Sequence, residues 1–217
     1  MTLLKTEILE PINKKKPKQI IILFHGYGGN GKNISLLANF WRKKLSSTLF
    51  YCPHAPMKCR NEKNKFKWFS EGNENSIKIK LQILNSVKKI HIFIDNVLKK
   101  NNLSEKNLVL GGFSQGCMLA LEAGLQRKNK IKAIIGYSGK IIDTKKISKK
   151  IKSKPKIILF HGDKDTIVLP KFYAETKKFL LKKNFDITTK LLKNCDHRIP
   201  SLGANLGLDL LANEMLL

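Results

Sequence analysis

The sequence contains little that would suit a membrane-spanning or secreted protein. No apolar run among its 217 residues is long enough to cross a bilayer, and residues 1–11 lack the basic segment and apolar core of a secretory signal peptide. Four cysteines, Cys52, Cys59, Cys117 and Cys195, form no C-x-x-C pair and no dense cluster. Because disulfide frameworks and zinc sites need clustered ligands, we expect reduced thiols, no metal and a cytoplasmic location.

Acidic residues are also scarce: 16 Asp and Glu stand against 42 Lys and Arg, which gives a net charge of +26. A field of this sign attracts nucleic acids and anionic lipids. The basic residues, however, are nearly all lysine, are spread along the chain and are not interleaved with aromatic residues. Since nucleic-acid recognition favours arginine and stacking aromatics, we expect no specific nucleic-acid partner. Weak association with anionic lipid stays open as a prediction.

Strand and helix patterns alternate along the chain, without internal repeats or a linker. Strands are predicted at residues 3–9, 19–24, 48–52, 108–110, 131–137, 156–160 and 186–192. Helices are predicted at residues 34–45, 76–100, 118–123, 170–183 and 201–217, with a basic connection at 141–154. This alternation predicts one doubly wound α/β domain over residues 1–217, with a mostly parallel sheet and helices on both faces.

A G-x-S-x-G sequence lies between one of these strands and the helix after it. Its serine is Ser114, in Gly112-Phe113-Ser114-Gln115-Gly116. In a strand–turn–helix context this pattern is the nucleophile elbow, which exposes a strained serine at the positive end of a helix. The two glycines allow strand and helix to approach closely. A second serine, Ser138, lacks the following x-Gly and precedes no predicted helix, so we favour Ser114 as the nucleophile.

The loop after the strand at residues 19–24 is rich in glycine, in His25-Gly26-Tyr27-Gly28-Gly29-Asn30-Gly31. A phosphate-binding loop is one interpretation, but G-x-x-x-x-G-K-[ST] and a suitably placed acidic residue are both missing. An oxyanion loop after an early strand of a hydrolase fits better, because its backbone N–H groups can approach a ligand.

Candidate acids and bases follow the later strands. Asp163 and Asp165 follow the strand at 156–160, and His197 precedes the last helix, which gives the order Ser…Asp…His of α/β-hydrolases. Asp196 is too close to His197 along the chain to face its ring. The other histidines fit packing or turn-bracing roles better: His25, His54, His91 and His161. Spacing alone does not separate Asp163 from Asp165.

The chain resembles the phospholipase/carboxylesterase family of α/β-hydrolases, which includes the acyl-protein thioesterases. The matching segments are LFHGYGGNG, YCPHAP, WFS, GGFSQGCMLAL, YSGKI, HGDKDTIV and DHRIP. The resemblance implies Ser114 as nucleophile, Asp165 as acid and His197 as base. It also implies an oxyanion hole from the backbone N–H groups of Tyr27 and Gln115. The chain departs from the family at Ser70, where Asp is usual, at Cys117, where Gly is usual, and at Leu169, which displaces a proline to position 170.

We therefore expect an α/β-hydrolase fold with little or no lid, and a serine carboxylesterase that hydrolyses small or single-chain acyl esters without a cofactor. Lysophospholipids or acylated proteins are alternative substrates for the same machinery. An idle fold that serves as a basic binding module for anionic membranes or nucleic acid is the non-enzyme alternative. Trp68 and Phe69 are aromatic residues in a polar stretch, so they either line the substrate pocket or pack beneath the loop.

Overall fold

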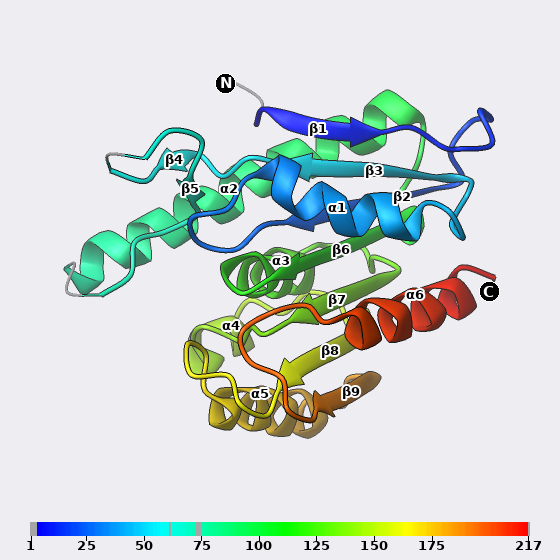
Figure 1. Cartoon of the computed structure of the whole chain (residues 1–217). Coiled ribbons are helices and arrows are strands. Elements are labelled where there is room, and N and C mark those ends of the chain that lie inside the picture. Colours follow the sequence, from blue (N-terminus) through cyan, green and yellow to red (C-terminus); the bar gives the residue numbers. More distant parts are fainter. Residues whose placement is uncertain (1–3, 61, 73–74, 217) are drawn as a thin grey trace.

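A seven-stranded sheet forms the centre of the computed structural model, which describes residues 4–60, 62–72 and 75–216 (Figure 1). Its strand order is β1-β3-β2-β6-β7-β8-β9. The strands are β1 (Thr6–Leu9), β2 (Gln19–Phe24), β3 (Thr48–Pro53), β6 (Leu108–Phe113), β7 (Ala133–Tyr137), β8 (Lys156–Gly162) and β9 (Ile187–Leu192). Edge strand β1 pairs antiparallel with β3, and every other neighbouring pair is parallel. The predicted mostly parallel sheet is thus confirmed.

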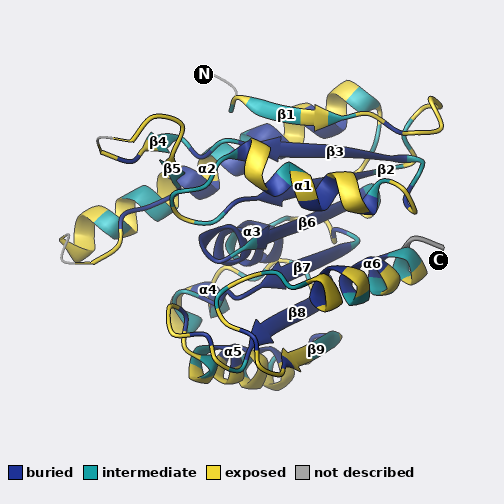
Figure 2. Ribbon diagram, in the orientation of Figure 1, coloured by how far each residue is buried: buried dark blue, intermediate teal, exposed yellow. Residues whose placement is uncertain are grey.

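Helices cover both faces of the sheet, as predicted. One face carries α1 (Gly31–Trp41) and α6 (Ser201–Leu216), and the other carries α2 (Ser76–Asn101), α3 (Gln115–Leu125), α4 (Thr144–Ser148) and α5 (Pro170–Lys182). Strand β2 shows why both layers are needed. Ile20 and Ile22 pack with α2 and α3, whereas Ile21 and Leu23 pack with α1. The continuous apolar run therefore fills two cores (Figure 2).

The structure adds short elements that the sequence patterns did not predict. The basic connection at 141–154 contains α4, which begins after Asp143, whose side chain accepts from the N–H groups of Lys145 and Lys146. The polar stretch after β3 contains a small hairpin of β4 (Met57–Lys58) and β5 (Phe66–Lys67). A 3₁₀ turn (Glu105–Asn107) precedes β6. Within the described ranges, no helix combines the length and apolar character that a bilayer crossing requires.

Candidate active site

Ser114 occupies a strained turn between β6 and α3. Its backbone has φ 54° and ψ −120°, and its N–H donates to the carbonyl of Tyr137 at 2.9 Å. Although Ser114 is the N-cap of α3, its side chain makes no capping hydrogen bond, so the hydroxyl can bond elsewhere. A Cβ on Gly116 would overlap the carbonyl oxygen of Phe24, and one on Gly112 would overlap the backbone of Gly116. The two glycines therefore permit the close strand–helix approach that the motif predicts.

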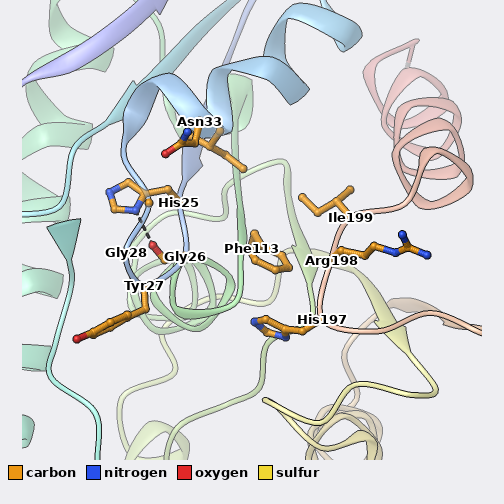
Figure 3. Close-up of a pocket in the computed structure, with 11 residues that line it drawn as sticks. His25, Gly26, Tyr27, Gly28, Asn33, Phe113, His197, Arg198 and Ile199 are labelled. Atoms are coloured by element: carbon orange, nitrogen blue, oxygen red, sulfur yellow. Dashed lines mark hydrogen bonds between the residues drawn. The ribbon is translucent and has the colours of Figure 1, made fainter. Parts of the chain in front are cut away.

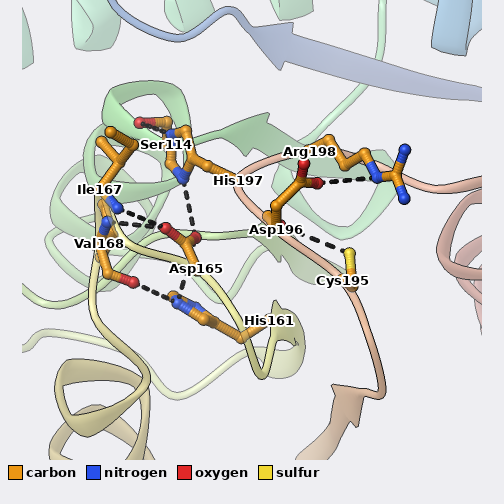
Figure 4. A network of polar contacts seen from close by, with 9 residues as sticks. All are labelled: Ser114, His161, Asp165, Ile167, Val168, Cys195, Asp196, His197 and Arg198. Carbon is orange, nitrogen blue, oxygen red and sulfur yellow. Dashed lines mark hydrogen bonds and ion pairs between the residues drawn. The ribbon is translucent and has the colours of Figure 1, made fainter.

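His197 lies against Ser114 from the loop between β9 and α6. Its Nε2 is 3.0 Å from Ser114 Oγ, and its Nδ1 is 2.8 Å from Asp165 Oδ2 (Figure 4). The ring also packs on Phe113, with centroids 4.8 Å apart. The three side chains follow β6, β8 and β9, so parallel strands bring their loops to one edge of the sheet. A hydroxyl, an imidazole and a carboxylate are thereby linked in one hydrogen-bonded line.

The two aspartates after β8 have separate roles in this geometry. Asp165 is buried, and its second oxygen accepts the N–H groups of Ile167 at 3.0 Å and Val168 at 2.8 Å. Burial raises the pKa of Asp165, but the hydrogen bonds from His197 and these amides outweigh it and hold the pKa below its ordinary value. Asp163 instead accepts the N–H of Cys195 at 3.1 Å, and so it braces the loop that carries His197.

Two further histidines at strand ends stabilise the loops around this line. His161 Nε2 donates to the carbonyl of Val168 at 2.6 Å, and burial lowers its pKa. His25 Nδ1 donates to the carbonyl of Gly26 at 2.7 Å while Nε2 accepts the N–H of Ala55 at 3.0 Å. Burial lowers the pKa of His25 to about 4. Both rings are therefore neutral near pH 7, and both are used in bracing, as their positions before glycine predict.

The chain is similar to a family of hydrolases, to two named thioesterases and to a solved esterase structure. A model of the family described as Phospholipase/Carboxylesterase matches residues 5–204. Acyl-protein thioesterase 1 of Kluyveromyces lactis is 28% identical over 183 residues, which cover 78% of this chain and 80% of that protein. Acyl-protein thioesterase 1 of Schizosaccharomyces pombe is 30% identical over 169 residues, covering 74% and 75%. The crystal structure of esterase PE8 is similar with a TM-score of 0.92 and 28% identity, covering 98% of this chain and 99% of that one.

The chain belongs to the phospholipase/carboxylesterase family. It is therefore a hydrolase that acts on ester or thioester bonds, with the α/β-hydrolase fold. The family departure at Cys117 has a local explanation. Glycines at 136 and 139 leave the space that its side chain fills, because a Cβ on either residue would meet Cys117. Burial raises the pKa of Cys117 to about 12, so the thiol stays protonated at neutral pH.

Cavities flank His197 and Ser114 in this family member. One, of about 410 Å³, lies between the glycine-rich loop and residues 197–199, with His25, Tyr27 and Phe113 in its wall (Figure 3). Another, of about 310 Å³, contains Ser114 itself. Its wall includes Phe69, Met118, Ile79, Ile83, Ile142 and Phe172 together with the charged residues Glu71 and Lys140. One side of the serine is therefore predominantly apolar.

Phe69 and Trp68 differ in their relation to that cavity. Phe69 lines it, in keeping with one of the two alternatives that the sequence leaves open. Trp68 is not among its wall residues and has no exposed surface, so the pocket interpretation of Trp68 is corrected to packing. Its indole N–H donates to the carbonyl of His25 at 2.9 Å, and its backbone N–H donates to Gln115 Oε1 at 3.1 Å. The polar loop folds back over the elbow through these bonds, which spacing along the chain does not reveal.

A third cavity adjoins the one at Ser114. This groove has a volume of about 600 Å³ and lies between α2, α3 and α4. It shares Ile79, Ile83 and Ile142 with the Ser114 cavity and adds Leu84 and Glu122. Burial raises the pKa of Glu122 to about 7, so this carboxyl is partly neutral at physiological pH. The sequence patterns did not predict this groove, although Leu84 lies within the helix predicted at residues 76–100.

Proposed function

We propose that Ser114, His197 and Asp165 form the catalytic triad of a serine hydrolase that cleaves single-chain acyl esters or thioesters. The observation that carries this proposal is the line from Asp165 Oδ2 through His197 to Ser114 Oγ, with links of 2.8 and 3.0 Å. A hydroxyl is a weak nucleophile until a base takes its proton, and a carboxylate fixes the tautomer of that base. In this line Ser114 is the hydroxyl, His197 the base and Asp165 the carboxylate.

In the proposed reaction, Ser114 Oγ attacks the acyl carbonyl while its proton passes to His197 Nε2. The backbone N–H groups of Tyr27 and Gln115 stabilise the oxyanion of the tetrahedral intermediate. Gln115 is the first residue of α3, so its N–H lies in the first turn, where no intrahelical acceptor exists. His197 then donates the proton to the leaving alcohol or thiol, and it later takes a proton from the water that releases the acid from Ser114.

The acyl chain is proposed to occupy the cavity at Ser114 and to continue into the adjoining groove. Phe69 and Met118 are apolar walls near the serine, and Ile79, Ile83 and Ile142 are common to both cavities. This path supports chains longer than a small ester, so lysophospholipids and acylated proteins stay as candidate substrates. The names of the Kluyveromyces and Schizosaccharomyces relatives favour the thioester alternative.

The test is hydrolysis of p-nitrophenyl esters from acetyl to palmitoyl, with matched S-acyl thiocholines as thioester probes. Wild-type protein and Ser114→Ala are compared at equal concentration. We expect turnover that depends on Ser114 and a catalytic efficiency that rises with chain length. Turnover that survives in Ser114→Ala would reject the nucleophile, and a decline beyond short chains would reject the groove as the acyl site.

We further propose a single domain over residues 1–217 and a cytoplasmic location. The four cysteines support the location, because all of them are free and buried.

A further inference from the structure

The first half of α2 is apolar, and only part of its apolar surface packs against the core. Residues 76–85 include five apolar side chains, and none of these ten residues is buried. The second half of the helix differs, since Val87, Ile90 and Ile94 are in the core. Figures 1 and 2 show the first turns of α2 extending past the sheet with exposed and intermediate surface around them. Ile79 and Ile83 still pack against the edge of the core, so the apolar surface that the fold leaves exposed comes from the other three side chains.

The most exposed of these side chains lie on one side of the helix. Ile77, Leu81 and Leu84 are 64%, 55% and 48% exposed, and their i, i+4, i+7 spacing aligns them in a stripe. Leu84 also belongs to the groove wall. The stripe is consequently the outer margin of the groove that adjoins the Ser114 cavity.

Lysines surround the same margin. Lys80 of α2 lines the groove from one side, and Lys146 and Lys150, within and just after α4, line it from the other. Acidic residues there are Asp143, which caps α4 and lies 3.6 Å from Lys146, and Glu122, whose pKa burial raises to about 7. An exposed apolar stripe bordered by lysines is complementary to a surface with anionic headgroups over acyl chains.

We propose that residues 76–85 of α2, together with Lys146 and Lys150, form a docking surface for an anionic lipid bilayer. Ile77 and Leu81 enter the headgroup boundary, and the lysines contact the lipid phosphates. A second copy of the chain fits this surface less well, because it would bring like-charged lysines together. Nucleic acid offers no apolar phase for the stripe. Docking goes beyond hydrolysis, since ester cleavage at Ser114 does not require it.

The experiment is sedimentation of the full chain with vesicles of phosphatidylcholine, with and without phosphatidylglycerol. The bound fraction should rise with phosphatidylglycerol and fall with salt. Ile77→Asp/Leu81→Asp should lower the partition coefficient by about tenfold or more, because two apolar contacts are replaced by charges of the wrong sign. Leu202→Asp is the matched control, since Leu202 is 60% exposed but lies on α6. This control should lose only about twofold, through its charge alone.

Equal binding by wild type and the double variant, or equal binding to neutral vesicles, would overturn the proposal. So would light scattering that shows a dimer which the double variant abolishes, without lipid binding. p-Nitrophenyl butyrate turnover separates this question from catalysis. Ile77 and Leu81 are not among the wall residues of the cavities at Ser114 and beside it, so turnover on this soluble ester should be unchanged.

Discussion

Ser114 and Ser138 lie at the ends of the adjacent strands β6 and β7, yet their surroundings differ. Both have positive φ, 54° and 49°, and both are buried. Each donates its N–H to the next strand, Ser114 to Tyr137 and Ser138 to Phe160, at 2.9 Å. After Ser114 a helix begins and His197 lies 3.0 Å from the hydroxyl. In the described part of the chain, no helix begins at Ser138 and no imidazole is paired with it.

From this contrast we infer that a serine with positive φ at a strand end needs further groups around it to act as a nucleophile. Gly116, two residues after Ser114, lets α3 pack on β2, whereas the residue two after Ser138 is Lys140. The loop after β9 places the imidazole of His197 beside Ser114. We therefore expect reactivity at Ser114 to depend on the helix dipole and the imidazole rather than on backbone strain.

Replacing each serine by alanine should give the largest difference in kcat between the two sites. Ser114→Ala should lower kcat on a p-nitrophenyl ester by about 10⁶-fold, because the nucleophile is lost. Ser138→Ala should stay within a few-fold of wild type. Steady-state kinetics on both purified variants, with circular dichroism to confirm folding, would measure this. A large loss in Ser138→Ala with an intact fold would make the two serines functionally equivalent.

The two aspartates after β8 extend the comparison to the acid. Asp165→Asn should lower kcat by about 10⁴-fold, because the amide no longer fixes the required tautomer of His197. Asp163→Asn should cost only a few-fold, since an amide oxygen can still accept the N–H of Cys195. The kcat values of the two variants, measured with the same p-nitrophenyl ester, show which aspartate matters more. The reverse ranking would assign Asp163 as the acid.

Gly116→Ala tests the close contact between α3 and β2, which is present after Ser114 and has no counterpart after Ser138. The added methyl would overlap the carbonyl oxygen of Phe24, so we expect more than about 3 kcal/mol of lost unfolding free energy. Gly203→Ala is the control, because its nearest neighbour is the flexible side chain of Leu192 at 3.0 Å. Urea denaturation of both variants would measure the effect. Equal stabilities would contradict the tight contact.

The smallest expected effect concerns His25, the buried histidine at the start of the glycine-rich loop. An unfolded histidine takes up its proton near pH 6.5, whereas His25 in the fold does so only at about pH 4. Between these values the unfolded chain binds more protons, so stability falls as pH drops, by on the order of 3 kcal/mol across the window. Urea midpoints at both ends of the window should show a smaller drop in His25→Gln. An identical drop would show that His25 is not the group responsible.

Sequence patterns predict the sheet and the order of Ser114, the aspartates and His197, because buried strands and the elbow glycines have strong local signatures. They do not separate Asp163 from Asp165, since two residues of spacing say nothing about which carboxylate faces the ring. They also leave the role of Trp68 open, because the groups that it contacts, such as Gln115, lie far away along the chain. The helical spacing of apolar residues over 76–100 predicts α2 correctly. It does not show that Ile77 and Leu81 lie outside the core, because their exposure depends on where the helix extends past the sheet.

The central claim is that Ser114 alone of these two serines is activated, and labelling with a fluorophosphonate tests it most directly. The serine oxygen displaces fluoride from phosphorus, and peptide mass spectrometry then locates the adduct. We predict one adduct, on the peptide containing Ser114, and its loss in His197→Ala. An adduct on Ser138, or labelling that persists without His197, would contradict the account.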